Sequence, residues 1–191
     1  MSKKTKHFFI FGILLLFLGY VSFWVLQYSP EDIRALVGEE HAYIALFLSA
    51  LLGGSSIFIP FPYYLVTISL GVAGFNPFLL ALVAGLGTTI GDMTTYYLAR
   101  SGRIFAPSKM RAYFSRTLYS LKEHHPKLIP IVTFLYAAFL PLPDDLIMAP
   151  AGLIQYPIKR LIVSVFSGKV VFNLCLAFAG YYGWERLVQL F

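Results

Sequence analysis

The stretch Leu140-Pro-Leu-Pro-Asp-Asp-Leu-Ile-Met-Ala-Pro-Ala-Gly152 decides the fold, because its Pro-x-Pro element occurs twice in apolar sequence. The earlier copy is Ile59-Pro-Phe-Pro-Tyr-Tyr-Leu-Val-Thr-Ile-Ser-Leu-Gly71, and a shift of 81 positions superposes the two. The same shift superposes Gly87 on Gly168. Prolines two residues apart break a helix, since they remove backbone donors and clash with the preceding turn. The repeat therefore predicts two hairpins, formed by Pro60, Pro62 and Gly71 in the first copy and by Pro141, Pro143 and Gly152 in the second.

Composition indicates an integral membrane protein. Of the 191 residues, 58% are hydrophobic and only 13% are charged, and the mean hydropathy is +0.72. Soluble domains are nearer half apolar and a quarter charged. Lys and Arg in cytoplasmic loops explain the net charge of +6, so we expect no nucleic-acid partner. The single cysteine, Cys175, excludes an intrachain disulfide and is expected to be a structural thiol.

The lengths of the apolar runs predict the topology. Runs at 8–28, 77–99 and 158–182 are each long enough to cross about 30 Å of hydrocarbon. The runs before the two breaks, 42–52 and 128–140, reach only about halfway at 1.5 Å per residue. Each broken segment is therefore predicted to enter the membrane and return to the same side.

This pattern predicts an all-α integral membrane protein built from an inverted repeat. Each repeat comprises a re-entrant helical hairpin and one transmembrane helix. Such a unit crosses the membrane an odd number of times, so two consecutive units have opposite orientations. The hairpin tips are then expected to meet near the midplane, which is where many transporters bind their substrates.

The distribution of charge predicts the orientation. Three lysines lie within residues 2–7, acidic residues dominate 29–41, and seven lysines and arginines lie within 100–127. The positive-inside rule then places the N-terminus in the cytoplasm and the protein in the cell (inner or plasma) membrane, as a multi-pass protein. Apolar residues alternate with the cations of 100–127, so this linker is expected to form an interfacial amphipathic helix.

Four charged residues in apolar surroundings are candidates for a substrate or proton site: Asp144, Asp145, Asp92 and Lys169. A carboxylate at membrane depth is costly and is a functional candidate by default. Two carboxylates side by side favour proton uptake. The alternative is that Asp144 and Asp145 cap the outgoing helix of the hairpin. Asp92 and Lys169 either flank one polar cavity or form a structural ion pair between packed helices.

Other residues have simpler expected roles. Gly87, Gly91 and Gly168 are predicted to allow close helix packing. Arg100 and Arg103 are candidates for contacts with lipid headgroups, or else act only as orientation signals. The four histidines lie outside the apolar runs and lack the spacing of a metal site. We therefore expect no enzyme activity, no catalytic residue, no metal and no cofactor.

The motifs resemble those of the DedA/VTT family, also called SNARE-associated Golgi proteins. The resemblance covers roughly residues 40–183 and rests on the two Pro-x-Pro segments, on the run from Gly87 through Asp92 to Tyr97, and on Gly168-Lys169. It implies facing re-entrant hairpins in a protein that translocates polyprenyl phosphate or phospholipid, or that scrambles lipids. It also implies dependence on the proton-motive force, although the first hairpin lacks the acid that many bacterial members have there.

On this resemblance the chain divides into an N-terminal transmembrane helix and one family domain. The helix takes residues 1–30 and the domain takes 40–183. Within the domain, repeat one spans 42–99, the basic linker spans 100–127 and repeat two spans 128–182.

The leading hypothesis is a translocase that moves phosphate-bearing lipids through a groove at the hairpin tips. Helix N-termini, Lys169 and the inside arginines would receive the anionic headgroup. One rival is a proton- or ion-coupled transporter of a small solute, and another is a membrane scaffold. The expected partners are anionic membrane lipids, and the sequence leaves the oligomeric state open, a homo-oligomer included.

Overall fold

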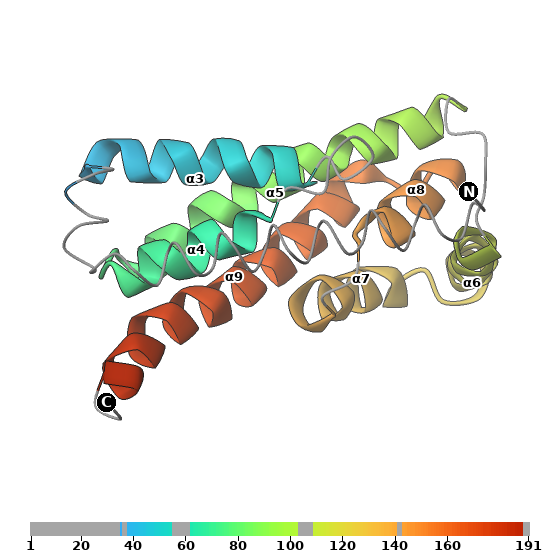
Figure 1. The fold of residues 1–191 in the computed structure, drawn as a ribbon. Helices are drawn as coiled ribbons and strands as arrows, with labels where there is room; N and C mark the ends of the chain where they lie inside the picture. Colours follow the sequence, from blue (N-terminus) through green and yellow to red (C-terminus); the bar gives the residue numbers. More distant parts are fainter. Residues whose placement is uncertain (1–34, 36–37, 55–61, 103–108, 141–142, 189–191) are drawn as a thin grey trace, which may run out of the picture.

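The computed structural model describes residues 35, 38–54, 62–102, 109–140 and 143–188, and this part of the chain is helical throughout (Figure 1). The helices are α3 (Glu39–Gly54), α4 (Tyr63–Val72), α5 (Pro77–Arg100), α6 (Lys109–His124), α7 (Leu128–Phe139), α8 (Asp145–Leu153) and α9 (Ile158–Val188). The predicted span at 8–28 and three predicted residues, Pro60, Arg103 and Pro141, lie outside the described residues.

The two long helices, α5 and α9, correspond to two of the predicted spans. Both are long and apolar enough to cross a membrane. Helix α5 begins at Pro77, where the missing N–H costs nothing. The side chain of Asn76 caps this end, because its oxygen accepts hydrogen bonds from the N–H groups of Phe78 (3.0 Å) and Leu79 (3.3 Å). Helix α9 continues to Val188, six residues beyond the prediction.

The short helices form two pairs that approach the middle of the molecule from opposite ends (Figure 1). Helices α3 and α4 enter from the end that holds the α4–α5 connection, and α7 and α8 enter from the end that holds α6. Helices α4 and α8 have only 10 and 9 residues. Each ends just before a residue in the left-handed conformation, Gly74 (φ 78°) or Gln155 (φ 52°), which helix geometry does not allow.

The helix pairs pack reciprocally on the long helices. Helix α3 lies on α5 and α7 on α9, whereas α4 and α8 cross over to α9 and α5 respectively. Gly71 of α4 abuts the carbonyl oxygen of Ala177, and Gly152 of α8 abuts the carbonyl oxygen of Tyr96. Both glycines, which the sequence assigned to the hairpins, lie inside helices and allow close helix contact.

Two further glycines have the packing role that the sequence predicts. A Cβ atom on Gly87 would lie 2.7 Å from the carbonyl oxygen of Phe47 in α3. A Cβ atom on Gly168 would lie 2.6 Å from the carbonyl oxygen of Phe134 in α7. The third glycine of this group, Gly91, is buried in α5. Helix α3 on α5 and helix α7 on α9 thus meet through the same kind of contact, at positions 81 residues apart on the long helices.

Helix α6 lies at one end of the molecule and packs against α8 (Figure 1). Leu118 is buried in this contact and Leu121 packs beside it, while Tyr119 and Ser120 are exposed. This alternation is the amphipathic pattern that the sequence predicts for the basic linker.

Candidate functional site

Charged side chains from three helices meet where α5, α8 and α9 come together. We call this cluster, formed by Asp92, Asp144, Asp145 and Lys169, the polar core. The Nζ atom of Lys169 lies 2.8 Å from Oδ2 of Asp92 and donates a hydrogen bond of 2.6 Å to Oδ2 of Asp144. The lysine of α9 is therefore shared between a carboxylate of α5 and one at the start of α8.

Asp145 ties the start of α8 to α5. Its Oδ1 accepts a hydrogen bond of 2.7 Å from the hydroxyl of Thr95, which lies one turn beyond Asp92. The side chain of Asp144 stands at the N-cap position but makes no capping hydrogen bond, because its carboxylate faces Lys169. The capping alternative is therefore wrong for the side chain of Asp144, and the four predicted residues are brought into one cluster.

Burial differs across the polar core. The side chains of Asp92 and Lys169 are 1% and 4% exposed, whereas that of Asp144 is 25% exposed. Two charges buried in contact are stable only as a pair, since each alone would lose its hydration without compensation. Two carboxylates, those of Asp92 and Asp144, contact the one ammonium of Lys169, so this trio carries a net negative charge when both acids are ionised. Asp144 is the partner of Lys169 that water or a ligand reaches first.

Sequence reasoning missed several polar residues that border the cluster. Asn173 donates a hydrogen bond of 2.9 Å from Nδ2 to the carbonyl oxygen of Lys169, and its own Oδ1 is buried with no hydrogen-bond partner among the described residues. Tyr63 lies beside Asn173 and within the electrostatic reach of Lys169. Asn173 follows Lys169 by four residues and Thr95 follows Asp92 by three. The signal that could have found these residues is their spacing, which places a polar residue on the same helix face as a buried charge.

The 81-residue shift relates members of this site in pairs. It superposes Tyr63 on Asp144, Thr88 on Lys169, and Asp92 on Asn173. Thr88 is buried, and its hydroxyl donates a hydrogen bond of 2.8 Å to the carbonyl oxygen of Ala84. Equivalent positions of the two halves therefore line the same region. In each pair, one residue is charged and the other is polar but uncharged.

The break before α8 is held by a tyrosine. The hydroxyl of Tyr136 in α7 donates a hydrogen bond of 2.9 Å to the carbonyl oxygen of Pro143. The same carbonyl also accepts a hydrogen bond of 3.1 Å from the N–H of Leu146, so it links the start of α8 to α7. The hydrogen bond fixes the residue that precedes Asp144.

Arg100 lies at the α6 end of α5, away from the polar core. Its guanidinium donates a hydrogen bond of 2.8 Å to the hydroxyl of Tyr96, which donates one of 2.6 Å to the carbonyl oxygen of Tyr156. Arg100 is otherwise exposed, so it remains a candidate for headgroup contact.

The outer face of α5 carries a shallow groove of about 680 Å³. It is lined mainly by apolar side chains: Ile90, Met93, Thr94, Tyr97, Leu98 and Ser101. Asp92 belongs to the same helix but faces the interior. One helix thus separates the polar core from a groove whose lining suits an acyl chain.

Comparisons with known proteins identify a domain family. The VTT domain matches residues 59–182. The uncharacterized protein MJ0201 of Methanocaldococcus jannaschii is 25% identical over 133 residues, which are 70% of this chain and 80% of that protein. No solved structure matches the chain.

Proposed function

The chain belongs to the VTT-domain family of helical membrane proteins, and on that premise we propose that it translocates phosphate-bearing lipids, such as phospholipids or polyprenyl phosphate, between the leaflets. The observation that carries the proposal is the contact between Lys169 and Asp144. It joins a long apolar helix to the start of a short one, and one of its two partners is accessible. Ionisable groups at such a place are functional candidates by default.

We propose further that the two helix pairs are re-entrant and the halves inverted. Helices α3, α4, α7 and α8 have 16, 10, 12 and 9 residues. At 1.5 Å per residue they extend about 14 to 24 Å, less than the roughly 30 Å of the hydrocarbon core. The pairs approach from opposite ends (Figure 1). This arrangement supports an inverted repeat with a cytoplasmic N-terminus in the cell membrane.

A phosphate reaches Lys169 by exchanging with Asp144. Asp144 is the exposed partner, and a phosphate oxygen offers the ammonium the same charge-assisted hydrogen bond. The excess of acids would repel an anionic headgroup, so proton uptake by a carboxylate must accompany its entry. Meanwhile, the acyl chains remain in the bilayer along apolar surfaces such as the groove on α5.

The second candidate is ion-coupled transport of a small solute. The same excess of two carboxylates, Asp92 and Asp144, over one ammonium favours it, because the surplus charge suits a proton or cation. The scaffold alternative calls for a core that is closed to ligands, which the exposure of Asp144 disfavours.

Reconstitution tests the proposal. We expect purified protein in liposomes to expose fluorescent phosphatidylglycerol to a membrane-impermeant quencher, and Asp144→Asn to reduce the rate at least tenfold. The asparagine keeps the shape of the side chain but removes the charge that Lys169 binds. A matched control is Lys159→Gln, an exposed change on α9 that should leave the rate unaltered. Translocation by Asp144→Asn at the rate of the unaltered protein would overturn the assignment of the site.

A further inference from the structure

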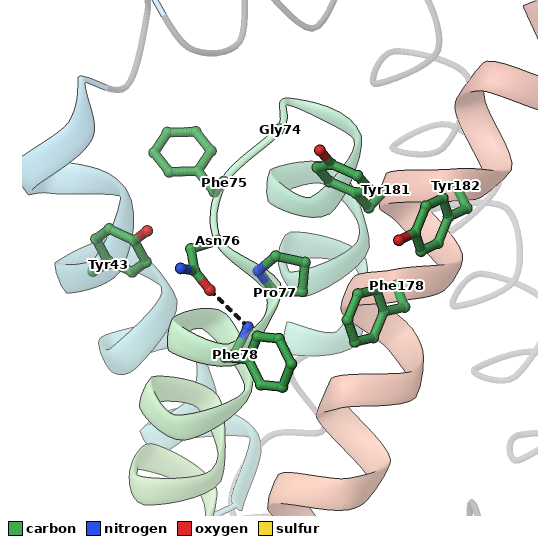
Figure 2. A pocket seen from close by; sticks show the side chains of 9 residues that line it. All are labelled: Tyr43, Gly74, Phe75, Asn76, Pro77, Phe78, Phe178, Tyr181 and Tyr182. Carbon is green, nitrogen blue, oxygen red and sulfur yellow. Dashed lines mark hydrogen bonds between the residues drawn. The ribbon is translucent and has the colours of Figure 1, made fainter.

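A pocket of about 500 Å³ lies between α3, the α4–α5 connection and the last turns of α9 (Figure 2). It is at the end of the molecule opposite α6 (Figure 1). No member of the polar core lines it, and none of the nine described residues that line it is charged. Six of them are aromatic: Tyr43, Phe75, Phe78, Phe178, Tyr181 and Tyr182.

Local structure gathers these rings from three elements. Phe178, Tyr181 and Tyr182 have the spacing i, i+3, i+4, which places them on one face of α9. The left-handed residue Gly74 follows α4 and turns the chain, so that Phe78 comes back toward that face, whereas the buried ring of Phe75 points to Tyr43 of α3 (Figure 2).

Three pairs of these rings meet near right angles, and one pair is stacked: Phe178 and Tyr182 are nearly parallel at 9°, with centroids 5.7 Å apart. Phe78 and Phe178 meet at an interplanar angle of 89°, with centroids 5.6 Å apart. Tyr181 and Tyr182 meet at 84°, with centroids 5.2 Å apart. Across the pocket, Tyr43 and Phe75 meet at 88°. Ring faces, which carry partial negative charge, are therefore turned in more than one direction.

The polar groups of the pocket narrow the chemistry of a ligand. Among the residues that the structure describes, the lining contains no lysine or arginine to bind a phosphate and no carboxylate to bind a metal or a primary ammonium. The oxygen of Asn76 already accepts the N–H groups that begin α5. What remains are ring faces, three tyrosine hydroxyls and the side-chain NH2 of Asn76, so no charged group is among them. A quaternary ammonium suits such walls, since it carries charge but has no N–H to satisfy.

We propose that this pocket binds a quaternary ammonium group, either on a lipid headgroup or on a free solute. The volume of about 500 Å³ lies in the range of small-molecule sites. Tyr181 and Tyr182 are 37% and 56% exposed, so the pocket is open to a ligand. The proposal does not depend on translocation, because the pocket and the polar core share no residue.

Binding to the purified full-length chain in dodecyl maltoside tests the proposal. Choline and tetramethylammonium should bind in isothermal titration, whereas 3,3-dimethylbutan-1-ol, the uncharged isostere of choline, should bind at least fivefold more weakly. Equal binding of the neutral isostere would mean that the pocket recognises only apolar shape. If neither choline nor tetramethylammonium bound, the rings would serve only as an interfacial anchor. Both results overturn the proposal.

Variants locate the site. Tyr182→Leu keeps an apolar side chain but removes a ring face, and should weaken choline binding about two- to fivefold. The double variant with Phe178→Leu should weaken it further. A matched control is Tyr119→Leu, since Tyr119 is 52% exposed on α6 at the other end of the molecule. Elution in gel filtration like the unaltered protein would verify folding. Unchanged choline affinity in the folded double variant would place the cation elsewhere.

Competition identifies the source of the cation. Short-chain phosphatidylcholine should displace choline if the pocket receives a lipid headgroup, and phosphatidylglycerol should not. Choline binding that neither lipid displaces would assign the pocket to a free solute. Displacement by both lipids alike would contradict recognition of the ammonium group.

Discussion

The two halves of the molecule, α3–α5 and α7–α9, share a packing scheme but differ in their polar residues. Gly71 and Gly152 occupy equivalent positions and each meets a backbone carbonyl of the other half's long helix. Gly87 and Gly168 are equivalent too, and each meets a short helix of its own half. Close backbone contact is thus kept in both halves.

The polar residues are not kept in the same way. The first half has Tyr63 and Thr88 where the second has Asp144 and Lys169, and it has Asp92 where the second has Asn173. Lys169 therefore finds one acid in its own half and one in the other. The comparison teaches that the two halves can share the same helix packing without sharing the same charged positions. Because the charged residues of the polar core are divided between the halves, their ion pairs join the two.

The two ends of the molecule differ as well. At the α6 end, Lys122 donates a hydrogen bond of 2.7 Å to the carbonyl oxygen of Ile154, the C-cap residue that follows α8. At the other end, the residues after α4 line the open aromatic pocket. The C-terminal end of α8 is therefore bound by a lysine, whereas the C-terminal end of α4 borders a cavity.

The largest effect is expected from removing the charge that joins the halves. Lys169→Met leaves the buried carboxylate of Asp92 without its partner and should lower the free energy of unfolding by about 3–5 kcal/mol. The equivalent change in the first half, Thr88→Val, removes only a hydrogen bond and should cost about 1 kcal/mol. Thermal unfolding in detergent measures both.

A second substitution sharpens this comparison. Adding Asp92→Asn to Lys169→Met neutralises the abandoned carboxylate and should recover part of the lost stability. Strict additivity of the two changes would show that the pair does not interact. An equal cost for Thr88→Val and Lys169→Met would remove the claimed difference between the halves.

Much of the fold could be predicted because helix length and proline breaks act locally. The runs at 77–99 and 128–140 correspond to α5 (Pro77–Arg100) and α7 (Leu128–Phe139). The ends of α4 and α8 could not be predicted, because a left-handed residue ends each of them. After α8 that residue is Gln155, and glutamine, unlike glycine, does not indicate a left-handed conformation in a sequence.

The candidate site was partly visible in the sequence. Charged residues stand out in apolar runs, so Asp92 and Lys169 were found, and an ion pair was one expected arrangement. The connection of Asp144 to Lys169 depends on how α8 crosses to the long helices, which spacing along the chain does not specify. Uncharged partners such as Thr95 and Asn173 were missed, because a single threonine or asparagine in a helix does not by itself indicate a functional site.

A smaller effect should test whether the packing is repeated. Gly71→Ala and Gly152→Ala each push a methyl group against a backbone carbonyl, and should each destabilise by about 1–3 kcal/mol. The control is Gly183→Ala in α9, where nothing lies within 4 Å and alanine favours the helix. Chemical unfolding would compare the three. A large cost at only one of the two equivalent glycines would contradict repeated packing.

The smallest effect concerns the equivalent turns after α4 and α8. Gly74 adopts its positive φ without strain, whereas Gln155 does so at a cost. Gln155→Gly should therefore stabilise the protein by up to about 1 kcal/mol, seen as a higher midpoint in thermal unfolding. A lower midpoint would show that the side chain of Gln155 has a stabilising role that the first half lacks.

Labelling from the two sides of the membrane tests the central claim, that the halves enter from opposite faces. His41 in α3 and Lys127 before α7 are exposed, so each can be changed to cysteine in a background that carries Cys175→Ala. In intact cells, a membrane-impermeant maleimide should label the His41→Cys variant. It should label the Lys127→Cys variant only after permeabilisation. Labelling of both positions from the same side would contradict the inverted arrangement.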